Sequence, residues 1–253
     1  MQPLMDFVAG PLFRLTFAIM LLGLLRIVVL TVWGVIQARR QTDDKVMPWK
    51  LITENTLGWL VPVLRLWKTR PIYSVVSFVF HIGLILVPIF LIGHIQLIRE
   101  SIGIGWPVLS DNLADILTIV TMVTAVALFL GRLFSKEARF ISRPQDYVWP
   151  VLLAIPFATG YVCNNMAIGA GVYQWTMLFH MLSAELIFVF IPFTKIAHCV
   201  LVPFSQMVST LGWKFPPRSG EGVAETLGTV SYTHLRAHET VLDLVCRLLL
   251  EKK

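Results

Sequence analysis

Apolar residues along the chain gather in five long runs that are separated by shorter polar stretches. A helix that crosses a membrane needs about 20 predominantly apolar residues, and each run reaches that length. The runs are residues 12–36, 72–98, 113–134, 148–170 and 175–202. A further segment, 51–67, is shorter and amphipathic and is interrupted by Pro62, which is typical of a helix at the membrane surface. The pattern predicts an all-α integral membrane bundle of five transmembrane helices.

The distribution of charge gives this bundle an orientation. Hydrophobic residues make up 56% of the chain and charged residues 14%, whereas a soluble domain carries about 25% charged residues. The net charge of +6 comes from basic residues after the first, third and fifth runs, while the other loops hold a single basic residue, Arg99. Positively charged loops stay cytoplasmic, so we predict the N-terminus outside and the C-terminus inside. The same distribution argues against nucleic acid as a partner.

Four of the six histidines lie inside two of the apolar runs. His81 and His94 belong to the second run, and His180 and His198 belong to the fifth. An ionisable side chain within a membrane is a functional candidate by default. Because the second and fifth spans run antiparallel, depth pairs His81 with His198 near the inside and His94 with His180 near the outside. Imidazoles are axial ligands of haem iron, so we predict two haems stacked across the membrane.

Helical geometry supports one half of this arrangement and opposes the other. His180 and His198 are 18 residues apart, which is about 27 Å and five turns, so one continuous helix presents both on the same face. His81 and His94 are 13 residues apart, which rotates the second by about 220°. Pro88 lies between them and can kink the helix, and Gly83 and Gly93 leave space for a flat macrocycle.

Three further polar residues within the runs are weaker candidates. Arg26 and Lys195 lie toward the inner side, where a basic group neutralises haem propionates or extends to the interface. Glu185 follows His180 by five residues and either accepts a proton from a quinol or pairs with a neighbouring helix. No Cys-x-x-Cys-His sequence is present for covalent attachment, so the predicted haems are of the non-covalent b type.

Two other classes of function compete with electron transfer. A transporter or channel can use membrane histidines as a proton relay, but the sequence lacks the inverted repeat that many transporters share. A passive membrane anchor needs no cofactor, and four depth-matched histidines have no role in it.

Two stretches resemble the nitrate reductase gamma subunit family of dihaem membrane cytochromes b. They read HIGLILVPIFLIGHI at 81–95 and FHMLSAELIFVFIPFTKIAHCVLVPF at 179–204. The resemblance implies two haems b bound by histidines of the second and fifth helices, and electron exchange with a menaquinone pool in a bacterial inner membrane. Carried onto this chain, the axial ligands are His81, His94, His180 and His198.

The chain departs from nitrate reductase subunits at two places. Its first two histidines are more widely spaced, and Thr194 and Lys195 stand where the family commonly has Ser-Arg. These features, with the opening at 10–28, look more like relatives in respiratory complexes of sulfate-reducing bacteria. That resemblance implies iron–sulfur or multihaem cytochrome c partner subunits and leaves nitrate reduction in doubt.

The C-terminal end has a different character. Residues 230–240 read VSYTHLRAHET, which resembles the translation of a transposase-type sequencing adapter. We therefore interpret 1–213 as the dihaem membrane domain, 214–229 as a cytoplasmic tail and 230–253 as read-through that is not native. An amphipathic helix over 239–253 is the alternative interpretation. His234 and His238 have the i,i+4 spacing of a metal-binding pair, but they fall in the same segment and are not counted as ligands.

Overall fold

The computed structural model describes residues 1–41, 46–61, 63 and 67–211, and every regular element in these ranges is a helix. Five of these helices are long and apolar enough to cross a membrane. They are Gln2–Arg40, Pro71–Phe90, Asp111–Phe134, Pro144–Asn165 and Ala170–Phe193. Each overlaps one predicted run, so the predicted all-α fold with five apolar helices is confirmed. The predicted tail at 214–253, with His234 and His238, lies outside the described residues.

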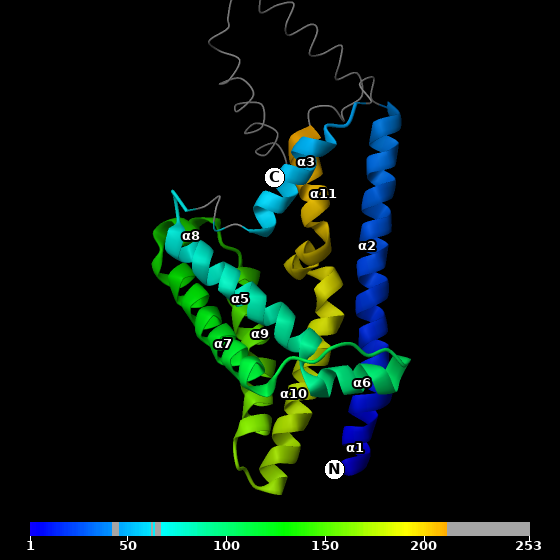
Figure 1. The fold of residues 1–253 in the computed structure, drawn as a ribbon, viewed down its shortest axis with the longest axis vertical. Helices are drawn as coiled ribbons and strands as arrows, with labels where there is room; N and C mark the ends of the chain where they lie inside the picture. Colours follow the sequence, from blue (N-terminus) through cyan, green and yellow to red (C-terminus); the bar gives the residue numbers. More distant parts are fainter. Residues whose placement is uncertain (42–45, 62, 64–66, 212–253) are drawn as a thin grey trace, which may run out of the picture.

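The first span consists of three consecutive helical elements. α1 (Gln2–Phe7), the π-helical turn η1 (Val8–Leu12) and α2 (Phe13–Gln41) follow one another directly, and Figure 1 shows them as one long column at the edge of the bundle. Pro11 lies inside η1. Proline has no N–H to donate and crowds the preceding turn, and the wider π turn accommodates it without ending the helix. The span therefore begins earlier than the predicted 12–36.

The second run is divided into two helices. α5 (Pro71–Phe90) ends at Leu91, whose backbone is extended with φ −71° and ψ 134°, and α6 (Ile92–Ile102) begins directly afterwards. Figure 1 shows α6 lying across the direction of the long helices. The predicted single span over 72–98 is therefore wrong. Pro88 lies three residues before the break, where it weakens the helical hydrogen-bond ladder.

The carbonyl groups freed by this break all find new partners. Three consecutive carbonyls at the end of α5 each accept a hydrogen bond from beyond the helix. The three bonds run from His94 Nδ1–H to Pro88 O (3.0 Å), from Trp106 Nε1–H to Ile89 O (2.8 Å) and from Leu109 N–H to Phe90 O (2.9 Å). These bonds satisfy carbonyls that the break leaves without an intrahelical partner, so the segment after α6 folds back and stabilises the break.

The remaining long helices are α7 (Asp111–Phe134), α9 (Pro144–Asn165) and α10 (Ala170–Phe190), with the short α8 (Lys136–Ile141) between the first two. α5 packs against α7, α7 against α9, α9 against α10 and α10 against α2. α10 thus lies between α9 and α2. α9 contacts the turn of α10 that carries His180, and α2 contacts Phe188 near the end of α10.

Glycine determines how closely two of these helices approach. Gly83 of α5 lies against Thr121 and the carbonyl of Leu117 in α7, and a Cβ at this position would overlap the threonine hydroxyl. The prediction that Gly83 leaves room for a macrocycle is therefore wrong, because it serves the α5–α7 contact. At Gly93, by contrast, a Cβ would meet no atom within 4 Å beyond its own helix backbone in the described part of the chain.

The fifth run is also divided. α10 ends at Phe190, two 3₁₀ turns follow at η2 (Ile191–Phe193) and η3 (Lys195–Ala197), and α11 (His198–Leu211) continues the chain. Thr194 between the turns is extended, with φ −129° and ψ −177°. The predicted continuous helix over 175–202 is therefore wrong, and five uninterrupted turns do not connect His180 with His198.

The amphipathic segment forms α3 (Trp49–Leu60), which packs on α11 at the end of the bundle opposite to α6 (Figure 1). Ile52 and Met207 are buried in this contact. The side chains packed around them are Val35, Met47 and Phe204. Pro62, predicted to interrupt the segment, lies outside the described residues, and α3 ends shortly before it.

Candidate functional site

The four membrane histidines form two facing pairs. In what we call the inner pair, after its predicted side, the ring centres of His81 and His198 are 6.2 Å apart and the ring planes are 77° to each other. In the outer pair, the ring centres of His94 and His180 are 6.1 Å apart and the planes are within 8° of parallel. The structure thus brings together the same partners that depth in the membrane predicted.

Two helix breaks make this pairing geometrically feasible. Leu91 separates α5, which carries His81, from α6, which carries His94. The 13-residue rotation that opposed the pairing on an ideal helix therefore does not apply. His198 is the first residue of α11, directly after the 3₁₀ turn η3, so its orientation is also independent of α10.

Every one of the four rings uses its Nδ1 atom to contact a backbone carbonyl. The contacts are His81 to Ser77 O (2.6 Å), His94 to Pro88 O (3.0 Å), His180 to Pro156 O (2.9 Å) and His198 to Lys195 O (2.7 Å). A carbonyl oxygen only accepts, so Nδ1–H is the donor and the neutral ring keeps its lone pair on Nε2. This is the tautomer, fixed by an outer hydrogen bond, that metal-ligating histidines have.

The distance within each pair matches that of two imidazoles on one metal. A metal–nitrogen distance of about 2.0 Å, with each ring centre about 1.1 Å beyond its nitrogen, places two opposed ring centres about 6.2 Å apart. The observed separations are 6.2 and 6.1 Å. The ring separations of both pairs therefore fit two histidines that would hold one haem iron between them.

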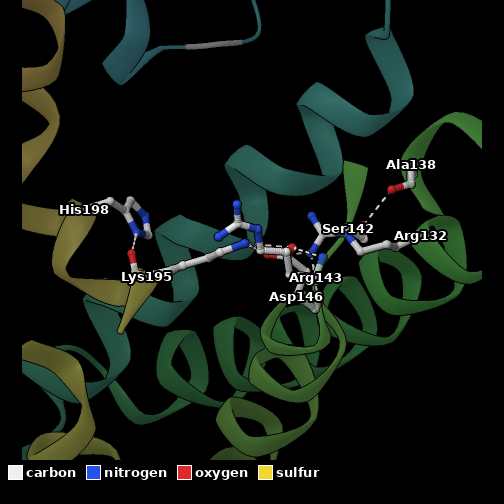
Figure 2. A network of polar contacts seen from close by, with 7 residues as sticks. All are labelled: Arg132, Ala138, Ser142, Arg143, Asp146, Lys195 and His198. Atoms are coloured by element: carbon white, nitrogen blue, oxygen red, sulfur yellow. Dashed lines mark hydrogen bonds and ion pairs between the residues drawn. The ribbon is translucent and has the colours of Figure 1, made fainter. Parts of the chain in front are cut away.

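A charged network lies next to the inner pair (Figure 2). Lys195 Nζ donates to both carboxylate oxygens of Asp146, at 2.7 and 2.8 Å. Arg132 donates to the backbone carbonyl of Asp146 at 2.8 Å, and the backbone N–H of Arg143 donates to its carboxylate at 2.8 Å. Since the carbonyl of Lys195 accepts the His198 bond, this network connects α7 and α9 to an inner histidine.

Asp146 is the residue of this charged network that sequence reasoning missed. It lies 49 positions from Lys195, and such a distance hides the pairing. A local signal existed, because an acidic residue in the first turn of a helix that opens with proline is a common N-terminal feature. Lys195, predicted to contact a propionate, is directed toward Asp146, and its side chain remains 46% exposed.

The other weaker candidates form no hydrogen bond or ion pair with the histidine rings within the described ranges. Arg26 is exposed on α2. Glu185 is 5% exposed, and its Oε2 has no hydrogen-bond partner in the described part of the chain. Glu185 shares a face of α10 with Phe188, three residues later, whose ring packs on Phe13 and Phe17 of α2. Five residues rotate a helix by about 140°, so Glu185 is directed toward the α2 side of α10, away from the direction of His180.

One curated relative was found among known proteins. The chain is 34% identical over 154 residues to a protein of Nitratidesulfovibrio vulgaris (strain Hildenborough) that is called only "Protein". The aligned part covers 60% of this chain and 67% of the relative. No family model matches the chain, and no solved structure matches it. By its identity and coverage, the chain belongs to the same family as this Nitratidesulfovibrio vulgaris protein.

Proposed function

We propose that the chain is a membrane electron-transfer subunit of a respiratory redox complex, which passes electrons between the menaquinone pool and partner subunits through two haems b. One observation carries the proposal. Two histidine pairs each combine a ring separation of 6.1 to 6.2 Å with Nδ1 bonds to backbone carbonyls that leave the Nε2 lone pairs available to a metal. A single such histidine is common in proteins, but four in matched pairs are typical of a dihaem cytochrome.

The chain's own residues hold and orient the cofactors in this proposal. His81 and His198 bind one haem, and His94 and His180 bind the other. Bound haem supplies a reversible one-electron couple between ferric and ferrous iron. The Nδ1 bonds fix each ring and raise the basicity of Nε2, which favours the ferric state. The surrounding apolar helices lower the local dielectric constant around His81, His94 and His180, which are partly buried.

Charges near the inner pair fit the anionic edge of a haem. Lys195 and Arg132 lie around a single carboxylate, Asp146, at 2.7 and 3.8 Å. The cluster retains positive charge after this pairing, which is available to propionates at the inner level. Arg26 is a second candidate for the same role, because it forms no ion pair within the described ranges.

Glu185 is the residue we propose for proton transfer with quinol. It is a buried carboxylate, and the alternative of a pairing with a helix neighbour finds no partner for its Oε2 among the described residues. A carboxylate within reach of a quinol hydroxyl can accept its proton as the electron leaves. Iron–sulfur or multihaem cytochrome c subunits are the proposed partners, in a bacterial inner membrane.

Haem content is the decisive test. Detergent-purified chain should contain two non-covalent haems b per polypeptide by pyridine haemochrome analysis, and both should be reducible by a menaquinol analogue. A preparation with membrane-inserted, folded chain and no haem would contradict the proposal and leave the proton-relaying transporter as the better hypothesis. One haem per chain would contradict the pairing of all four histidines.

A further inference from the structure

The ring of His180 is held by three residues of α9, which are Pro156, Thr159 and Gly160. Its Nδ1–H donates to Pro156 O at 2.9 Å, and the hydroxyl oxygen of Thr159 lies 3.3 Å from the same nitrogen. The Thr159 proton is directed to the carbonyl of Ile155 at 2.8 Å, so a lone pair of the hydroxyl remains to accept from His180. The imidazole N–H is therefore shared between two acceptors of one neighbouring helix.

Gly160 lets the α9 backbone lie directly against the ring of His180. A Cβ at position 160 would lie 2.9 Å from His180 Cε1 and 3.2 Å from its Nδ1. Side-chain carbon atoms essentially never approach that closely, so any larger residue displaces or rotates the ring. The glycine lets the α9 backbone lie against the imidazole while Pro156 and Thr159 bind its edge.

We infer that Thr159 and Gly160 are positioning residues that set the ring plane of His180 and keep the outer pair parallel. The inference rests on the proposed function, because it concerns the geometry of a haem ligand. His94 is oriented separately, by its bond to Pro88 across the helix break. The 8° angle between the two ring planes therefore depends on α9 holding the ring of His180 in place.

The consequence is spectroscopic as well as structural. Parallel imidazole planes interact with only one of the two iron π orbitals, whereas perpendicular planes interact equally with both and leave these orbitals nearly degenerate. Outer and inner haems should therefore give distinct low-spin EPR signals. The outer signal should have the smaller spread of g values, and the inner signal, from planes 77° apart, the larger.

The test compares three α9 variants with control changes in α7. Gly160→Ala should move the outer EPR signal toward the wider spread of the inner one and leave the inner signal in place. Thr159→Val should shift the outer signal less and raise the outer midpoint potential, since one acceptor of the Nδ1–H is lost; Thr159→Ser should restore both. The controls are Gly131→Ala and Thr124→Val. Among the described residues, the methyl group added at 131 meets no atom within 4 Å beyond its own helix backbone, and the Thr124 hydroxyl bonds only to its own helix.

Each outcome decides the inference separately from the proposed function. Wild-type chain without two haems contradicts the function itself. Wild-type chain with two haems, but with an outer signal that Gly160→Ala leaves unchanged or that moves equally in Gly131→Ala, contradicts only the positioning role. Should Gly160→Ala fail to retain the outer haem, the Thr159→Val and Thr159→Ser pair decides: an unshifted outer potential in Thr159→Val would overturn the inference.

Discussion

The inner and outer histidine pairs have nearly the same ring separation but are held in different ways. In the inner pair, both Nδ1 atoms donate to carbonyls of their own segment: His81 to Ser77, four residues earlier, and His198 to Lys195, three residues earlier. Such bonds form whenever the local turn forms. The inner ligands are thus oriented by secondary structure.

The outer pair depends on tertiary structure instead. His180 donates to α9, a different helix, and His94 donates to Pro88 across the break at Leu91. That break is itself stabilised from beyond α6 by Trp106. The comparison indicates that the outer centre forms only after several helices have packed, whereas each inner ligand acquires its orientation locally.

Replacement of the four histidines should have the largest effect, and it tests whether the inner and outer pairs are separate sites. Replacing His94 or His180 by alanine should lower the haem content from two to one per chain and remove the same spectral component. Replacing His81 or His198 should remove the other component, because each iron loses its own axial ligand. Optical redox titration of the four variants measures this. The assignment of pairs would be wrong if His94→Ala and His198→Ala removed the same component.

The charged network should affect the inner pair alone, with a smaller effect. Asp146→Ala removes the bonds to Lys195 and Arg143, so the turn that carries Lys195 O is held less firmly against α9. Since Lys195 is half-exposed, we expect a loss of about 1 to 2 kcal/mol in unfolding free energy. The inner spectral component should broaden or titrate at an altered potential while the outer one is retained.

An exposed ion pair provides the control for this variant. Lys50 and Glu54 are 4.0 Å apart on α3, with side chains 90% and 60% exposed. Glu54→Ala should change the unfolding free energy by less than about 0.5 kcal/mol and leave both haem components unaltered. An equal response to Asp146→Ala and Glu54→Ala in thermal unfolding and in the redox titration would show that the network has no specific role at the inner pair.

Much of the arrangement could be predicted from the sequence because it follows from apolarity and depth. The five runs indicated membrane-length helices, and the positions of His81, His94, His180 and His198 within antiparallel runs identified which rings face each other. Depth along a membrane helix changes little when the helix bends, so the pairing was insensitive to errors in helical phase.

The helix breaks could not be located by the same reasoning. Leu91 and Ile191 are as apolar as their neighbours, so the hydropathy pattern continues through residues where the backbone hydrogen bonds change. Pro88 and Pro192 were the only local signals, and proline is tolerated within membrane helices, as Pro156 is in α9. Gly83 faces α7, and Asp146 contacts Lys195 from 49 positions away. Both contacts depend on how the helices pack, and the local sequence pattern does not show this packing.

The weakest expected effect concerns the hydrogen bond from Trp106 that stabilises the break between α5 and α6. This bond should matter for the outer pair and not for the inner pair. Trp106→Phe keeps an aromatic ring but removes the N–H that donates to Ile89 O at 2.8 Å. One hydrogen bond of this kind contributes about 0.5 to 1 kcal/mol, and water at this exposed site can replace part of it. We therefore expect only slight destabilisation of the whole chain. The loss should nevertheless fall on the break that positions His94, because His81 lies in the preceding helix and donates its Nδ1–H to the carbonyl of Ser77. Measured by haem retention during dilution in detergent, the outer haem should dissociate faster in Trp106→Phe, and the inner haem should dissociate at the wild-type rate. Faster loss of both haems to the same extent would mean that the break stabilises the bundle as a whole and does not serve the outer ligand.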